Sequence, residues 1–336
     1  MKTLTEFWFL IPGLIFIFLV SLSMTIIYRK WAISKHIFDI PNERSAHLQP
    51  VPRGGGIAVV LSWYIIVFFL FFSHYFPQSL FIALLFGIPV ALIGMIDDLW
   101  TISPYLRLLV QFLCATLAIF FLRGLLHIDL GFTILEPSLI LNIAAILGTV
   151  WFINLFNFLD GIDGYISAEI MFICLSAFIL TGSVLPLFLS AATAGFLLRN
   201  WQPAKIFMGD VGSTLLGFTI AVFSIFFQNT CHSSVIIWLM LTSLFWFDAS
   251  VTLLRRIING EKISEAHKKH AYQRIVQSGF SHQQTVLSAI FINCVIFILT
   301  FLATIFPKYL LILFLLNILF LFIVLKIVDR RFPFKK

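Results

Sequence analysis

The sequence predicts an all-α integral membrane protein with about eleven transmembrane helices, built as a single domain over residues 1–336. Hydrophobic residues make up 60% of the chain and charged residues only 11%, whereas a soluble domain carries about a quarter charged residues. The mean hydropathy is +1.04, and apolar runs of about 18 residues or more recur throughout, each long enough to cross a bilayer. These runs are continuously apolar rather than alternating, which argues against a membrane β-barrel.

The predicted spans are joined mostly by short segments, the longest of which are 28–55 and 254–284. The first span is expected to be an uncleaved anchor, because no small-residue cleavage site follows it and Tyr28, Arg29 and Lys30 close it. The predicted spans cover residues 7–27, 56–76, 79–96, 105–122, 138–153, 164–182, 184–199, 213–229, 234–253, 285–305 and 309–327.

Basic residues set the predicted orientation, because cytoplasmic loops of membrane proteins are enriched in Lys and Arg. With the loop 28–55 in the cytoplasm, that side of the membrane carries 19 of the 22 Lys and Arg residues, and the other side carries only Lys2, Arg123 and Lys308. The N-terminus is therefore predicted outside and the C-terminus in the cytoplasm. One cytoplasmic working face would then hold the loops 28–55, 97–104, 154–163, 200–212 and 254–284.

A glycine run, Gly54 to Gly56, lies directly before the second span. Free backbone N–H groups and the positive end of a helix dipole at such a position suit a phosphate or a nucleotide. A flexible turn between loop and span is the alternative.

Two adjacent carboxylates, Asp97 and Asp98, follow the third span. Like charges at a membrane edge repel each other, and their hard oxygen ligands favour Mg²⁺ or Mn²⁺. An ordinary helix end is the alternative, but acidic residues at a helix C-terminus oppose the helix dipole. The pair therefore predicts a functional site.

Four polar residues recur every three positions between the fifth and sixth spans: Asn154, Asn157, Asp160 and Asp163. At this spacing the side chains would line one face if the segment were helical, and their oxygens would suit Mg²⁺ or a polar ligand. The alternative is a turn in which Asp and Gly serve backbone geometry.

Two further aspartates stand beside or within spans. Asp210 lies among glycines before the eighth span, where a ligand has room to approach, and its alternative is N-capping by Asp210 or Ser213. Asp248 lies within the ninth span, where an ionisable residue is a functional candidate, and its alternative is pairing with Arg255 or Arg256.

The largest cytoplasmic loop carries His267, His270 and Arg274, which could share one helical face. A face of His and Arg side chains matches a polyphosphate. Zinc bound by the two histidines would lack a third ligand nearby, and a basic helix on the membrane surface is the other alternative.

Acidic residues, Mg²⁺ and cationic side chains together are the groups used for displacement at phosphorus, so the chain is predicted to be a membrane phosphotransferase. A cytoplasmic site in a lipid-embedded body implies one soluble and one lipid substrate. Two alternatives stay open. A secondary transporter would need acids near the midplane and internal repeats. A CDP-alcohol-type phosphotransferase would need Ala-Arg soon after the first Asp-Gly, a pattern that this chain lacks.

Five sequence motifs are spread over nearly the whole chain: Pro52 to Gly56, Asp97 with Asp98, Asn154 to Gly164, Phe207 to Ser213, and the loop His267 to His270. In these elements the chain resembles the polyprenyl-phosphate N-acetylhexosamine-1-phosphate transferases (glycosyltransferase family 4). Its eleven predicted spans with an outside N-terminus resemble the O-antigen-initiating branch more than the ten-span translocase. The resemblance implies that an N-acetylamino-sugar 1-phosphate moves from a UDP-sugar to undecaprenyl phosphate with release of UMP. This reaction would start an O-antigen or another cell-envelope glycan at the bacterial inner membrane, with Mg²⁺, or alternatively Mn²⁺, as cofactor.

The same resemblance implies roles for individual residues. The expected catalytic residues are Asp97, Asp98 and Asp210, of which Asp97 or Asp98 would deprotonate the lipid phosphate or attack the donor. The expected metal ligands are Asp210, Asn157 and Asp98. The expected substrate-binding residues are His47, Arg53, Asn154, Asp160, Asp163, His267, His270 and Arg274.

The partners expected from the resemblance are the UDP-N-acetylamino sugar, undecaprenyl phosphate and membrane lipid, with no nucleic acid and with a homodimer left open. The loop at 267–273 lacks the three consecutive histidines of the peptidoglycan translocase, which argues against a muramoyl-pentapeptide donor. Its His-Ala-Tyr-Gln is similar to the branch that uses 6-deoxy amino sugars such as N-acetylfucosamine or N-acetylquinovosamine. UDP-N-acetylglucosamine stays open as the donor.

Overall fold

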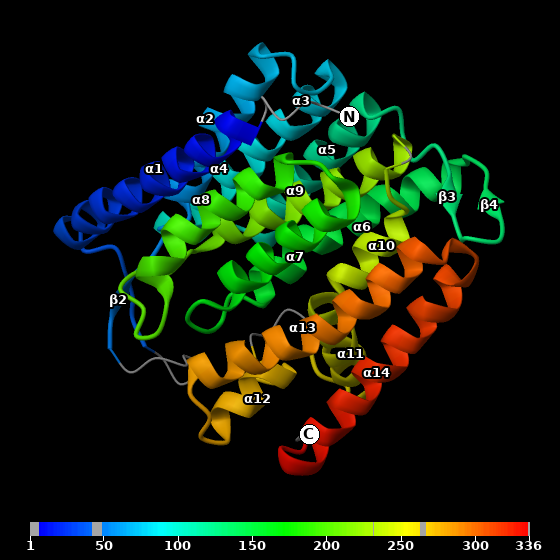
Figure 1. Cartoon of the computed structure of the whole chain (residues 1–336). Coiled ribbons are helices and arrows are strands. Elements are labelled where there is room, and N and C mark those ends of the chain that lie inside the picture. The colour runs from blue at the N-terminus through cyan, green and yellow to red at the C-terminus, as the bar shows by residue number, and fades with distance from the viewer. Residues whose placement is uncertain (1–6, 42–48, 231, 263–266, 335–336) are drawn as a thin grey trace.

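Helices account for almost all of the regular structure in the computed structural model, which describes residues 7–41, 49–230, 232–262 and 267–334 (Figure 1). Two short antiparallel hairpins join some of the helices: β1 (Phe38–Asp39) pairs with β2 (Val51–Pro52), and β3 (Ile128–Asp129) pairs with β4 (Ile134–Leu135). The helices are α1 (Phe7–Ser34), α2 (Ile57–Phe72), α3 (Gln78–Leu85), α4 (Gly87–Leu99), α5 (Pro104–Phe121), α6 (Leu139–Phe158), α7 (Tyr165–Thr181), α8 (Leu185–Asn200), α9 (Asp210–Asn229), α10 (Val235–Leu241), α11 (Ser243–Ile258), α12 (Ala271–Gln277), α13 (His282–Ile305), the 3-10 turn η2 (Pro307–Tyr309) and α14 (Leu310–Arg331).

Each of the eleven predicted spans coincides with a helix or a pair of consecutive helices, and the prediction of a multi-pass helical membrane protein is confirmed. In the described residues, seven helical stretches are long and apolar enough to cross a membrane, and α10 with α11, bent by 76°, would be an eighth. α2, α7 and α8 have 16, 17 and 16 residues, and a 16-residue helix rises only about 24 Å against a hydrocarbon core of about 30 Å. The count of eleven spans and the orientation therefore stay predictions.

α9 is the central helix of the molecule and packs against α2, α4 and α6 (Figure 1). Its membrane-spanning window is 89% buried, as expected for a helix that is largely apolar on all sides. Small residues let the neighbours approach closely. A Cβ added at Gly94 of α4 would lie 2.6 Å from the backbone oxygen of Asp210, and one added at Gly217 of α9 would lie 2.5 Å from that of Phe152. These contacts fix the register of the helices that carry the candidate site.

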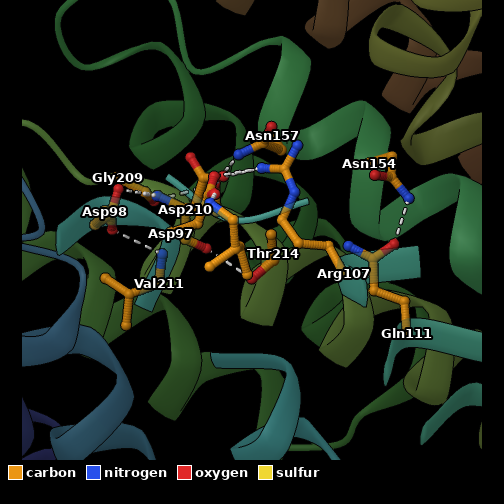
Figure 2. A network of polar contacts seen from close by, with 12 residues as sticks. Asp97, Asp98, Arg107, Gln111, Asn154, Asn157, Gly209, Asp210, Val211 and Thr214 are labelled. Atoms are coloured by element: carbon orange, nitrogen blue, oxygen red, sulfur yellow. Dashed lines mark hydrogen bonds and ion pairs between the residues drawn. The ribbon is translucent and has the colours of Figure 1, made fainter. Parts of the chain in front are cut away.

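The predicted polar clusters meet at one end of this helix bundle. α4 ends beside the start of α9, and α6 ends beside it as well, so acids from three separate segments lie around the first turn of α9 (Figure 2). The short helix α12 packs next to this region and next to the C-terminal end of α14 (Figure 1).

Candidate active site

The first turn of α9 is capped by an aspartate from another helix. Gly209, which precedes α9, has a φ of +76° and no side chain to act as a cap. The Asp98 carboxylate at the end of α4 instead accepts hydrogen bonds from the backbone N–H of Asp210, at 3.0 Å, and of Val211, at 3.1 Å. Asp98 opposes the dipole of its own helix but stabilises the positive end of α9. The alternative of an N-cap by Asp210 or Ser213 is therefore wrong.

Asp98 is also paired with Arg53 and is almost completely buried. The Nη2 atom of Arg53 lies 2.6 Å from Asp98 Oδ1, and the Asp98 side chain is only 2% exposed. The Asp98 side chain is thus nearly closed off from solvent, unlike that of Asp97, which is 15% exposed, and this leaves Asp98 poorly placed to take up a proton or bind a cation. Arg53 keeps a partly exposed side chain beside the site.

Its neighbour Asp97 shares a guanidinium with Asp210. The Nη1 atom of Arg107, one turn into α5, lies 2.5 Å from Asp97 Oδ2 and 2.9 Å from Asp210 Oδ2 (Figure 2). The other Asp97 oxygen accepts a hydrogen bond from the backbone N–H of Ile102 at 3.0 Å. Asp97 and Asp210 are therefore brought together around one positive charge, and both side chains remain partly exposed.

Arg107 was absent from the predicted site. In the sequence it is one of many basic residues at the ends of predicted spans, which the orientation alone explains. The available signal was its position ten residues after Asp97, close enough to return to the acidic pair across a short turn.

Asn157 and Asp160 complete the acidic cluster from the end of α6. The Asn157 amide donates to Ser213 Oγ at 3.3 Å and also hydrogen-bonds Asp210 (Figure 2). Burial, together with the charges of Asp210 and Asp98, raises the pKa of the Asp160 carboxyl to about 8, against an opposing effect of the Gly209 backbone N–H. Asp160 therefore lies close enough to these acids to be affected by their charge.

The other two residues of the predicted polar face, Asn154 and Asp163, are directed elsewhere. Asn154 donates to Gln111 Oε1 at 2.7 Å, away from the acids in Figure 2. Asp163 accepts from the backbone N–H of Ala204 at 3.0 Å and lies 3.2 Å from His282 Nδ1. The prediction of one helical face is wrong because three residues turn a helix by about 300° rather than a full circle, and because α6 ends at Phe158, before the two aspartates.

The glycine run at the start of α2 is used for packing rather than as an open phosphate site. The backbone N–H groups of Gly55 and Gly56 donate to the carbonyl oxygens of Phe207, at 2.9 Å, and Met208, at 2.8 Å. A Cβ at Gly56 would lie 2.5 Å from the Cα of Gly212. The N–H groups of Gly55 and Gly56 are therefore occupied, and these two residues instead join α2 to the segment before α9.

The start of α12 is also capped by an aspartate from another helix. Asp248 in α11 accepts from the backbone N–H of Ala271 at 2.9 Å, and His270 Nδ1 lies 3.9 Å from the same carboxylate oxygen. The alternative, an ion pair of Asp248 with Arg255 or Arg256, is not formed between these residues as the structure describes them. Arg255 instead pairs with Asp329 at 2.7 Å, and Arg256 pairs with Glu261 at 3.1 Å.

The predicted polyphosphate face of the large loop is divided in the structure. Burial, followed by the charge of Arg256, lowers the pKa of His270 to about 4, and burial with the charge of His270 lowers that of His267 to about 4 as well. Both histidines are therefore neutral at pH 7 and would contact a phosphate as neutral groups. Arg274 lies with Asp329 at 2.8 Å, toward α14. His47 lies outside the described residues.

The geometry allows a direct test of the expected metal site. The described residues contain no cluster of three or more His, Cys, Asp or Glu arranged around a metal position. Mg²⁺, however, commonly uses one or two carboxylates and completes its shell with water and substrate phosphates. Asp210 and the Asn157 amide fit that requirement with the partly exposed Asp97 close by, whereas Asp98 fits it less well because its side chain is only 2% exposed.

Comparison with known proteins agrees with this arrangement of polar residues. A model of glycosyl transferase family 4 matches residues 80–228, which include the acids around α9. A probable undecaprenyl-phosphate N-acetylglucosaminyl 1-phosphate transferase of Bacillus subtilis is 31% identical over 284 residues, 80% of this chain and 78% of the relative. An undecaprenyl-phosphate alpha-N-acetylglucosaminyl 1-phosphate transferase of Yersinia pestis is 30% identical, over 81% of this chain and 78% of the relative. A decaprenyl-phosphate N-acetylglucosaminephosphotransferase of Mycobacterium leprae is 28% identical, over 74% and 72%.

Proposed function

Because the chain belongs to the polyprenyl-phosphate N-acetylhexosamine-1-phosphate transferases of glycosyl transferase family 4, we propose that it transfers a sugar 1-phosphate from a nucleotide-linked donor to a polyprenyl phosphate. This membership favours the transferase over the transporter and the CDP-alcohol-type enzyme. In the full proposal the donor is a UDP-N-acetylamino sugar, the acceptor is undecaprenyl phosphate, and UMP is the product released. The reaction would take place at the cytoplasmic face of a bacterial inner membrane.

The reaction is a displacement at the phosphorus that carries the sugar. An oxygen of the lipid phosphate attacks this phosphorus, and the bond from it to the bridging oxygen of the donor diphosphate breaks. The electron pair of that bond leaves with UMP, and the product is a polyprenyl diphosphate sugar. All three phosphoryl groups are negatively charged, so the protein must bring cations to them.

The observation that carries this proposal is the Asp97–Arg107–Asp210 arrangement, in which one guanidinium lies between two partly exposed carboxylates. A guanidinium is well suited to bind phosphate oxygens, so Arg107 would exchange the two carboxylates for the donor diphosphate. Asp97 would then be free to orient the lipid phosphate and accept its proton. Asp98 would position Asp210 through the start of α9 rather than react.

Mg²⁺ would be held by Asp210 and Asn157, and Asp97 rather than Asp98 would be the nearby carboxylate that accepts the proton. When bound, Mg²⁺ would neutralise charge on the phosphate oxygens during the displacement. Asp160 lies next to this group and would face the same substrate.

The proposal is tested with the purified chain in vesicles that contain undecaprenyl phosphate. UDP-N-acetylglucosamine, UDP-N-acetylfucosamine and UDP-N-acetylquinovosamine, each labelled in the sugar, are supplied separately with Mg²⁺ or with a chelator. We expect the label to enter the lipid fraction with one UMP released for each sugar transferred, only when Mg²⁺ is present. Release of UDP would show transfer of the sugar without its phosphate and would overturn the proposal.

A further inference from the structure

A basic pocket of about 470 Å³ lies between α12 and the C-terminal end of the chain. Among the described residues, those that line it include four cationic side chains and no carboxylate. The cationic lining residues are Lys268, Lys269, Arg274 and Arg331. Gln277 and Ser278 add amide and hydroxyl groups to the same wall. The composition of the lining therefore selects for an anion with several acceptor oxygens.

The basic pocket lies on the face of α12 that points away from the acidic cluster. On the other face, the Tyr272 hydroxyl donates to the carbonyl oxygen of Phe158 at 3.3 Å, beside the loop that carries Asp160. Tyr272 and Arg274 are two residues apart, which places their side chains about 200° apart around the helix. A ligand of the basic pocket is thus separated by α12 from the site proposed for sugar-phosphate transfer.

Arg274 is held rigidly in the wall of the basic pocket and has a donor left over. Its Nη1 atom contacts Asp329 Oδ1 at 2.8 Å and the carbonyl oxygen of Phe332 at 2.5 Å. Its Nε–H is buried and has no hydrogen-bond partner in the described part of the chain. The contacts of Nη1 therefore keep the Arg274 guanidinium and its positive charge in the wall of the basic pocket.

The basic pocket also lies where a membrane-spanning helix ends. Arg331 is the last residue of α14, and Phe332 and Pro333 follow it in the pocket wall. In Figure 1, α12 lies beside this end of α14, at the other end of the helix from the β3–β4 hairpin. The phosphates of anionic lipid headgroups are found at this depth, next to apolar side chains that reach into the acyl region.

We propose that the basic pocket binds a phosphate group, supplied either by the headgroup of an anionic phospholipid or by a soluble phosphate. The phosphate oxygens would pair with Arg331 and Lys268, close to the positive charge of Arg274. Binding would tie α12 to the end of α14, and α12 in turn contacts the end of α6 through Tyr272.

The test uses the full-length chain in neutral detergent and follows thermal unfolding. Phosphatidylglycerol is added in one arm with phosphatidylcholine as its uncharged-headgroup control, and inorganic phosphate is added in another arm with chloride at equal ionic strength. Saturable stabilisation is expected in at least one arm. Arg331→Gln should raise the half-saturating concentration about tenfold, the typical effect of one lost charge-assisted hydrogen bond.

Arg330→Gln is the matched control, because it removes the same charge from the adjacent residue, which does not line the basic pocket. It should change the half-saturating concentration less than about twofold, as expected for a screened surface charge. Stabilisation by phosphatidylglycerol alone would identify the headgroup as the source, and stabilisation by inorganic phosphate would identify a soluble one. No stabilisation in either arm, or equal weakening by both variants, would overturn the proposal.

Discussion

The starts of α9 and α12 are built in the same way but have opposite electrostatic surroundings. Each start receives a buried aspartate from another helix, Asp98 for α9 and Asp248 for α12, which accepts hydrogen bonds from backbone N–H groups. Around α9 the further neighbours are acids that share Arg107. Around α12 they are two neutral histidines and a group of cations whose partners include Asp329. A buried acid in a membrane helix is thus not in itself a sign of catalysis, because a helix start can satisfy it completely.

What separates the two regions is the balance of charge that remains after capping. Near α9, the partly exposed Asp97 and Asp210 have one cation between them, so the region has acceptor oxygens to offer a metal ion. Near α12, the lining of the adjacent pocket is cationic, so that region has donors to offer an anion. The same kind of cap therefore lies beside the proposed metal site in one region and beside the proposed phosphate pocket in the other.

The largest expected difference between the two regions is in the transfer rate after each capped helix loses one aspartate charge. Asp210→Asn should lower the transfer rate by about 10³ or more, as expected for loss of a group that stabilises charge in the transition state. Asp248→Asn keeps an oxygen that can accept from Ala271 and should lower the rate less than about tenfold. Rates measured as lipid-linked sugar formed per minute, at matched folded protein, decide the comparison. Similar losses in both variants would show that the two aspartates do not differ in role.

A medium effect is expected from Arg107→Gln, which leaves Asp97 and Asp210 facing each other without their shared cation. In the absence of divalent ions this variant should lose about 1 kcal/mol of stability, in the range for a partly exposed ion pair. Mg²⁺ should then stabilise the variant more than the original chain, because the ion no longer competes with the guanidinium. The measurement is the shift of the unfolding temperature on addition of Mg²⁺, with Arg107→Lys as the charge-preserving control. An identical shift in all three proteins would contradict the proposed metal site.

The smallest effect is expected from pH and belongs to the α12 region. The pKa values of His267 and His270 are lowered from 6.5 to about 4, so the unfolded chain binds more protons than the folded one between these two pH values. The stability that they contribute is fully present above pH 6.5 and is lost as the pH falls toward 4. Unfolding temperatures measured at pH 7.5 and 5.5 should therefore differ by less in a His267→Gln/His270→Gln variant than in the original chain. An unchanged difference would assign the pH response to other groups.

The sequence was sufficient for the fold class and for the main members of the acidic cluster. Hydropathy located the long helices but not the short polar helix α12, because burial in lipid demands long apolar runs whatever their tertiary contacts. Asp97, Asn157 and Asp210 were each recognised as polar groups at span ends, and the structure brings them together. The difference between Asp97 and Asp98 was not predictable, because it depends on which of two neighbouring side chains faces the start of α9.

The same limit explains the other differences between sequence and structure. The glycine run before α2 indicated accessible backbone N–H groups, but whether these bind a ligand or the carbonyl oxygens of Phe207 and Met208 is decided by contacts far apart in sequence. The role of Arg107 was hidden for a similar reason, since its two partners lie 10 and 103 residues away.

Asp210 is the first residue of the most deeply buried of the spans, and no loop separates it from the core of the protein. Its carboxylate is consequently anchored to the most buried helix of the molecule, whereas Asp97 and Asn157 come from the ends of its neighbours. Substrates of such an enzyme would have to be positioned against the Asp210 carboxylate. A change in donor preference would then have to arise in the surrounding loops rather than at Asp210.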